Sequence, residues 1–180
     1  AGHQFWYGLV ANNEFEEAWL DEGFTTYSTA KVMELGYGRD TSFVDFLGLE
    51  LGAVEADRGQ NHLERRYDQI ATVAWGFSRR AYGFNAYARP ALMLETLEGM
   101  LGEETMARVM RTYHERYRFG HPRGNDFYAV AEEVSGRDLD DSGLTPAQLT
   151  ALVAAVGDDS VSGQGAKQVL VTDGGVPTAD

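Results

Sequence analysis

The 180-residue sequence contains no cysteine. Disulfide bonds and thiolate chemistry are therefore excluded, and a metal site would have to use histidine, aspartate or glutamate. Lysine is also scarce, since Lys31 and Lys167 are the only two, and the formal net charge is −13. Because nucleic-acid binding depends on neutralising phosphates with basic side chains, this charge excludes nucleic acid as the expected partner. No run approaches the ~20 apolar residues of a membrane-spanning helix.

The apolar residues that are present predict a mainly α fold. They make up 43% of the chain, which suffices for a packed core, and over residues 1–139 their spacing is mostly helical. Residues 140–180 carry fewer aromatic side chains and more glycine, serine and aspartate. We therefore expect a helical domain over 1–139 and an irregular tail over 140–180, with a short helix near 145–156 and a short strand near 167–172.

Three helices are expected in the first third of the chain. Residues 1–11 resemble the end of one helix. Asn13, with Glu16 three residues later, predicts a capping box for a second helix that ends at Gly36. Asp40 is a plausible N-cap of a third helix through Leu51. The second helix should turn these side chains toward a core: Ala18, Trp19, Phe24, Tyr27 and Val32.

The pattern becomes strongly helical again after an irregular stretch over residues 52–78. Pro90 stands near the start of one apolar helix, where its missing N–H costs least, and Gly102 should end that helix. The next helix should end at Gly120. A last short helix should begin at Asn125 or Asp126 and end at residue 136.

The residues around His3 predict half of a metal motif. Zinc peptidases often use H-E-x-x-H, in which two histidines one helical turn apart bind zinc and the glutamate acts as general base. If His3 is the second histidine, residues 1 and 2 fill the two x positions. The first histidine and the glutamate would then stand directly before Ala1. Eighteen residues separate His3 from Glu22, which lies in "WLDEGFTTY" and could supply a third ligand.

Together these segments resemble the gluzincin aminopeptidases, the group of aminopeptidase N. That family combines H-E-x-x-H, eighteen residues and a glutamate in W-L-[ND]-E-G-F, as found here around Glu22. Downstream, "YARPALMLETLEGMLG" from Tyr87 and "DFYAVAEEVSGRDL" from Asp126 are similar to later blocks of the same family. The resemblance covers residues 1–139 and implies the helical half of a thermolysin-like catalytic domain.

The resemblance assigns roles to four residues. His3 and Glu22 would be the second and third zinc ligands, with one zinc ion in the intact site. Tyr87 would donate a hydrogen bond to the oxyanion of the tetrahedral intermediate, and Tyr82 would line the substrate pocket. The implied reaction is hydrolysis of an N-terminal peptide bond by a zinc-activated water, so the implied partner is a peptide substrate.

The sequence departs from the family pattern in several places. The first zinc histidine, the base glutamate and the upstream segment that grips the substrate amine are absent from the 180 residues. Arg89 and Pro90 replace the usual Lys-Gly, and Thr29 stands where several relatives carry an acid. We therefore expect a fragment of a catalytic domain, cut inside its metal motif and inactive alone. The alternatives are a non-catalytic helical module for binding or scaffolding, and a relative that uses the same zinc site on an epoxide.

Overall fold

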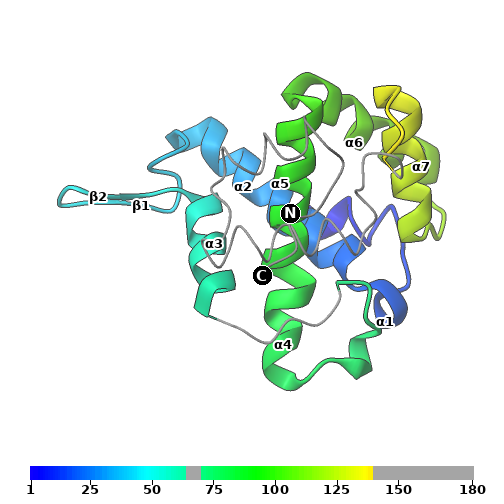
Figure 1. Ribbon diagram of the computed structural model, residues 1–180, viewed down its shortest axis with the longest axis horizontal. Helices are drawn as coiled ribbons and strands as arrows, with labels where there is room; N and C mark the ends of the chain where they lie inside the picture. The colour runs from blue at the N-terminus through cyan, green and yellow to red at the C-terminus, as the bar shows by residue number, and fades with distance from the viewer. Residues whose placement is uncertain (64–69, 140–180) are drawn as a thin grey trace, which may run out of the picture.

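The computed structural model describes residues 1–63 and 70–139, and it confirms the mainly α fold class (Figure 1). The expected tail lies outside the described residues. The helices are α1 Glu14–Glu17, α2 Trp19–Tyr37, α3 Ala53–Leu63, α4 Arg79–Gly83, α5 Arg89–Leu101, α6 Glu103–Tyr117 and α7 Gly124–Ser135. Shorter helical elements are η1 Gly2–Gln4, η2 Ala74–Gly76 and the π-helical η3 Phe84–Ala88. Two strands, β1 Val44–Phe46 and β2 Leu49–Leu51, pair antiparallel.

Helices α2 and α5 pack directly against each other at the centre of the fold. They approach closely because Gly23 has no side chain: a Cβ there would lie 2.5 Å from Cβ of Pro90. An ion pair holds the same two helices together at their other end, where Lys31 Nζ lies 3.0 Å from Glu95 and 2.9 Å from Glu98. The close approach of Gly23 to Pro90 fixes the position of the start of α2 relative to η3, and both elements contribute to the site described below.

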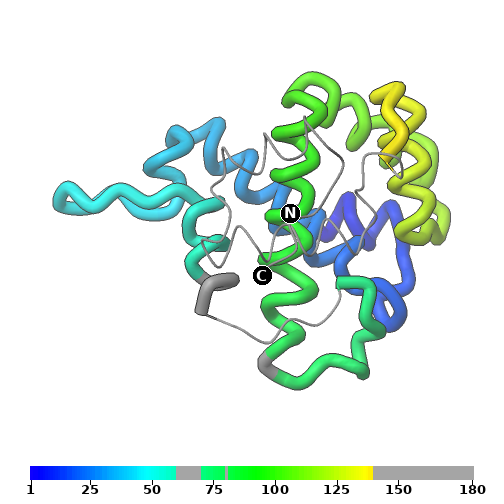
Figure 2. Tube along the Cα trace, in the orientation of Figure 1, coloured from blue at the N-terminus to red at the C-terminus, as the bar shows by residue number. Residues whose placement is uncertain are grey.

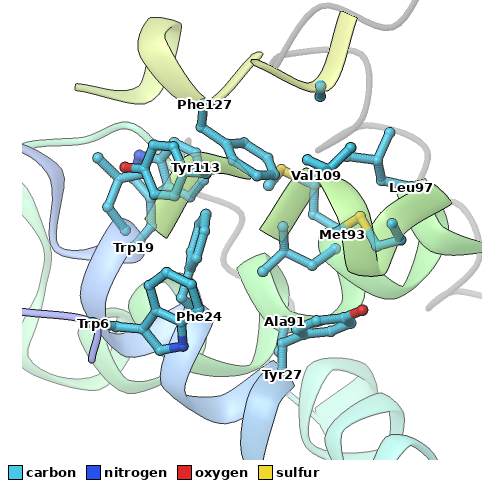
Figure 3. Packing of buried hydrophobic residues seen from close by; sticks show 14 of the residues in the cluster. Trp6, Trp19, Phe24, Tyr27, Ala91, Met93, Leu97, Val109, Tyr113 and Phe127 are labelled. Carbon is cyan, nitrogen blue, oxygen red and sulfur yellow. The ribbon is translucent and has the colours of Figure 1, made fainter. Parts of the chain in front are cut away.

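The hydrophobic core joins α2 to the α6–α7 pair through aromatic rings (Figure 3). The ring of Phe24 lies 4.9 Å from that of Phe127, 5.2 Å from that of Trp6 and 5.6 Å from that of Tyr113. Aromatic pairs at such spacings stabilise a core beyond the area that they bury. Three separate segments of the chain are therefore held around the N-terminal half of α2.

The first eleven residues form less helix than the sequence predicts. Only η1 is helical, and Tyr7 then takes a positive φ of 91°. The chain turns there because Trp6 and Val10 both enter the core, and the indole N–H of Trp6 donates to Ser28 Oγ at 2.8 Å. Core contacts thus replace further helical turns, which a short segment cannot sustain by itself.

Helix α2 differs from the prediction at both ends and on one face. Asn13 caps α1, as expected, by accepting a hydrogen bond from the backbone N–H of Phe15. The helical path is interrupted at residue 18, and Glu16 pairs with Arg123 instead of completing a capping box. The helix continues past Gly36 to Tyr37, and Gly38, which has a positive φ, ends it. Val32, expected in the core, is 67% exposed.

The helix expected from Asp40 is wrong, because residues 44–51 form the β1–β2 hairpin, which projects from the helical body (Figure 2). Leu47 and Gly48 take φ of 51° and 82°. Positive φ at both central residues is the geometry of the tight turn that matches the twist of a two-stranded hairpin. The apolar spacing of this segment fits a helix and a strand equally well, and the glycine turn decides between them.

The later helices follow the sequence more closely. Pro90 lies in the first turn of α5, and Gly102 ends that helix with a φ of 84°, as predicted. Helix α6 ends three residues before Gly120. Helix α7 begins at residue 124, and Asp126 accepts a hydrogen bond from the backbone N–H of Arg123 instead of acting as N-cap itself.

The irregular stretch after residue 52 contains a helix, α3, which packs against α5 and η3. Among the described helices, none combines the length and the apolar character that crossing a membrane requires.

Candidate metal and catalytic site

His3 and Glu22 come together because η1 lies against the start of α2. Nε2 of His3 is 3.5 Å from Oε2 of Glu22. The close approach depends on Gly2, where a Cβ would lie 2.6 Å from Cγ2 of Thr25. The two predicted metal ligands are thus adjacent, although eighteen residues separate them in the sequence.

The geometry of this pair fits zinc. Zinc binds histidine nitrogen at about 2.0–2.1 Å and carboxylate oxygen at about 2.0–2.2 Å, so two ligand atoms at a tetrahedral angle lie roughly 3.4 Å apart. The observed separation of Nε2 and Oε2 is 3.5 Å. Moreover, Oε2 of Glu22 is buried and accepts no hydrogen bond within the described part of the chain. A buried carboxylate oxygen that accepts no hydrogen bond has a lone pair free to bind a metal ion.

Asp21 completes the cluster, and the sequence reasoning missed it. Its Oδ1 lies 2.6 Å from Nδ1 of His3, and its side chain is 3% exposed. Burial raises the pKa of Asp21 to about 6, although the hydrogen bond and the charge of His3 oppose this rise. A carboxylate on the second nitrogen of a metal-binding histidine fixes the ring's tautomer and orientation. The available signal was an acid directly before Glu22 in an otherwise apolar "WLDEGF".

Tyr87 meets the same cluster from η3. Its hydroxyl donates a hydrogen bond to Oε1 of Glu22, so the expectation that these two side chains lie together is confirmed. Burial raises the pKa of Tyr87, and the hydrogen bond to Glu22 raises it further. The phenol therefore stays protonated at neutral pH and keeps its donor. Tyr87 lies in a π-helical turn, a distortion that often occurs at functional sites.

Tyr82 stands beside Tyr87 in a row of aromatic side chains. Its ring lies 6.1 Å from that of Tyr87 and 6.0 Å from that of Phe77, with edge-to-face geometry in both cases. Burial raises the pKa of Tyr82, with a smaller contribution from the charge of Glu22. These rings form an apolar wall next to the acidic cluster, and the role of Tyr82 in substrate binding stays a prediction.

The unusual Arg89-Pro90 pair does not disturb the helix that carries this side of the site. Arg89 is fully buried and donates from its guanidinium to Oδ1 of Asn85 one turn earlier. Proline in the first turn of a helix removes no intrahelical hydrogen bond. Ala88 and Arg89 keep helical backbone angles between η3 and α5, and Tyr87 lies next to Glu22.

In the part of the chain that the structure describes, one group of side chains could hold a metal ion with three ligands: His3, Asp21 and Glu22. Asp21 already bonds to Nδ1 of His3, which leaves Nε2 and the Glu22 carboxylate as the available donors. The described cluster thus offers two metal ligands, an orienting carboxylate and a phenol.

Comparison with known proteins identifies the family of this chain. A family model described as "Peptidase family M1 domain" matches residues 1–143. The chain is 29% identical over 140 residues to aminopeptidase N of Streptomyces lividans and 25% identical over 141 residues to aminopeptidase M1-C of Oryza sativa subsp. japonica. It is 26% identical over 140 residues to the tricorn protease-interacting factor F2 of Thermoplasma acidophilum.

These alignments cover 74%, 77% and 76% of this chain, respectively. The chain spans only about 16–17% of the length of these relatives. No solved structure gives a significant match. Because the family match extends over most of the sequence, the chain belongs to peptidase family M1.

Proposed function

We propose that this chain is part of a zinc-dependent aminopeptidase, to which it supplies the metal ligands His3 and Glu22 and the catalytic phenol of Tyr87. One observation carries the proposal: an imidazole nitrogen, a buried carboxylate and a protonated phenol converge from three separate segments. Membership of family M1, whose members are zinc-dependent, supports it. So do the relatives named as aminopeptidases.

Each side chain has a distinct role in this proposal. Zinc, when bound, activates a water molecule for attack on the peptide carbonyl. Asp21 holds the His3 ring so that Nε2 faces the metal, and Glu22 supplies a carboxylate oxygen. The Tyr87 hydroxyl donates a hydrogen bond to the oxyanion that forms on the substrate carbonyl. Tyr82 contacts the substrate with its ring.

The site needs contributions from the rest of a parent polypeptide. The described cluster supplies two ligands, whereas catalytic zinc sites in proteins use three and keep one position open. We infer that the missing histidine and the general base come from the segment before Ala1, in line with the short span of this chain on its relatives. The 180-residue chain by itself is then inactive.

The test is to express the parent polypeptide and to measure its zinc content and its hydrolysis of aminoacyl-anilides. We expect His3→Ala and Glu22→Ala to abolish both, because each removes one ligand. The matched controls are His121→Ala and Glu104→Ala: His121 contacts the backbone of Ala11, and Glu104 is exposed on α6.

Two results would contradict the proposal. One is a parent gene that lacks His-Glu before Ala1, which would indicate a non-catalytic helical module. The other is zinc-dependent turnover by the 180-residue chain alone at the rate of the parent, which would show that the described residues already form a complete site.

A further inference from the structure

A buried polar pair lies behind Tyr87 in the helical segment that carries it. Asn85 and Arg89 are both fully buried, and the guanidinium of Arg89 donates to Oδ1 of Asn85. Asn85 in turn donates from Nδ2 to the backbone carbonyl of Ala81, at 2.9 Å. Burying a guanidinium costs much free energy unless it is paired, so a pair at this depth constrains the backbone that holds it.

Tyr87 lies on the opposite face of the same turn. Residues four apart share one face of a helical turn, so Asn85 and Arg89 stand on one side and the residue midway between them stands on the other. The burial agrees with this arrangement: Tyr87 is 36% exposed, whereas Ala86 and Ala88 are 0% and 2% exposed. The buried pair thus anchors the back of the turn, and the front of the turn carries the phenol.

The turn is wider than an α-helical turn. In η3 the backbone N–H of Arg89 donates to the carbonyl of Phe84, which is the π-helical pattern. Pro90 offers no N–H to the carbonyl of Ala86, so the hydrogen-bond ladder of α5 does not extend backward through this position. Because π-helical turns are rare and short, a side-chain contact that spans one helps to maintain it, and the buried pair spans this turn.

The conformation of η3 decides whether Tyr87 reaches Glu22. The packing of Pro90 on Gly23, the residue directly after Glu22, sets the distance between the two segments. The direction of the phenol depends instead on the backbone of η3, from which the hydroxyl donates to Oε1 of Glu22. A return of this turn to α-helical geometry would rotate Tyr87 around the helix axis and away from the carboxylate.

We propose that Asn85 and Arg89 are positioning residues for Tyr87. Their buried hydrogen bond keeps η3 in its π-helical form, so that the phenol stays directed at the carboxylate of Glu22 and at the oxyanion that forms beside it. Both side chains are fully buried and therefore act through Tyr87, not on the substrate. The inference rests on the proposed function in giving the phenol its catalytic role.

A double-mutant cycle in the parent polypeptide tests the inference. Asn85→Ala removes an acceptor of Arg89, and its effect is measured with Tyr87 present and in the Tyr87→Phe background. With Tyr87 present, kcat should fall roughly 10–100-fold and KM should change less than about twofold, because a small displacement of a catalytic group costs rate. In Tyr87→Phe the same change should alter kcat less than about twofold, because the positioned hydroxyl is already gone. Asn85→Asp keeps an acceptor for Arg89 and should retain most of kcat.

An equal loss of kcat in the two backgrounds would indicate a general effect on the fold and would overturn the inference, as would no loss in either. Asn12→Ala is the matched control, because Asn12 is also a buried asparagine and donates to the backbone carbonyl of Glu17 at 3.1 Å. Its effect on kcat should be the same in both backgrounds. If Asn85→Ala does not fold, Asn85→Ser makes the same comparison, since the serine hydroxyl is too short to reach the guanidinium.

Urea unfolding of the same proteins separates this inference from the proposed function. Tyr87→Phe removes the bond to Glu22 and should lower the unfolding midpoint when Asn85 is present, but not in the Asn85→Ala background. Coupled midpoints in a parent without aminopeptidase activity would support the positioning pair and contradict the aminopeptidase. An active parent in which neither kcat nor the midpoint is coupled would support the aminopeptidase and contradict the positioning pair.

Discussion

The hydroxyl of Tyr87 bonds directly to the carboxylate of Glu22, although the two residues lie 65 positions apart in the chain. The contact joins the two halves of the family pattern at one point in space. The contact forms only if the core holds η3 and the start of α2 at a fixed position relative to each other.

Replacing Tyr87 by phenylalanine in the parent polypeptide should lower kcat about 10²–10³-fold, because one oxyanion donor is lost. The zinc content and KM should change little, since the ring remains and Glu22 keeps its other oxygen for the metal. The measurement is steady-state hydrolysis of an aminoacyl-anilide together with metal analysis. Tyr117→Phe on α6 is the matched control, because its hydroxyl donates to Asp126 and not to a residue of the cluster. A normal kcat in Tyr87→Phe would exclude a catalytic role.

Replacing Asp21 by alanine should weaken zinc binding about 10–100-fold, because the His3 ring loses the carboxylate that orients it. The affinity is measured by competition with a chromogenic chelator on the parent polypeptide. Asp21→Asn should retain part of the affinity, since its amide oxygen can still accept from Nδ1. Asp45→Ala, on the exposed hairpin, is the control. Equal affinity in the Asp21→Ala and Asp45→Ala proteins would refute the orienting role.

Gly23→Ala should destabilise the fold by about 1–3 kcal/mol, because the new methyl group would overlap Pro90 and force α2 and α5 apart. The clash is predicted from a Cβ–Cβ distance of 2.5 Å. Gly36→Ala in the same helix has open space around it and should stabilise the fold by up to about 1 kcal/mol through helix propensity. Urea unfolding of the two variants checks the opposite signs, and a shift of the same sign in both would contradict the close packing.

Asp57 on α3 should make stability depend on pH. Burial raises the pKa of Asp57 from 3.8 to about 6, so the folded state holds this proton more tightly than the unfolded chain does. The stability that Asp57 contributes is therefore full below pH 4 and is lost as the pH rises through 6. Asp57→Asn should stabilise the fold at pH 7 by about 1 kcal/mol, because the side chain is only partly buried, and should change little at pH 4. Unfolding midpoints at both pH values test this, and an equal effect at the two would contradict it.

Local signals predicted the parts of the fold that short-range physics controls. Pro90 and Gly102 mark the two ends of α5, where a missing N–H is tolerated and where a positive φ is required. The spacing from His3 to Glu22 predicted a pair of ligands, and the two side chains do lie together. The two ends of α5 depend on residue type and position alone, whereas the meeting of His3 and Glu22 also requires η1 to lie against α2.

Predictions failed where contacts between distant segments decide. The hairpin at residues 44–51 was mistaken for a helix because apolar spacing in a short run fits both periods. Val32 was expected in the core, yet nothing in the described chain covers it. The bond from Asp21 to His3 depends on η1 lying against α2, which no local pattern indicates.

The sequence by itself determined the family and the helical class, because these follow from motif, spacing and periodicity. The tertiary structure alone decided which atoms meet: Nδ1 of His3 with Asp21, and the Tyr87 hydroxyl with Glu22. The physical reason is that close contacts between segments far apart in the chain arise from the packing of the whole core. No single stretch of sequence specifies that packing.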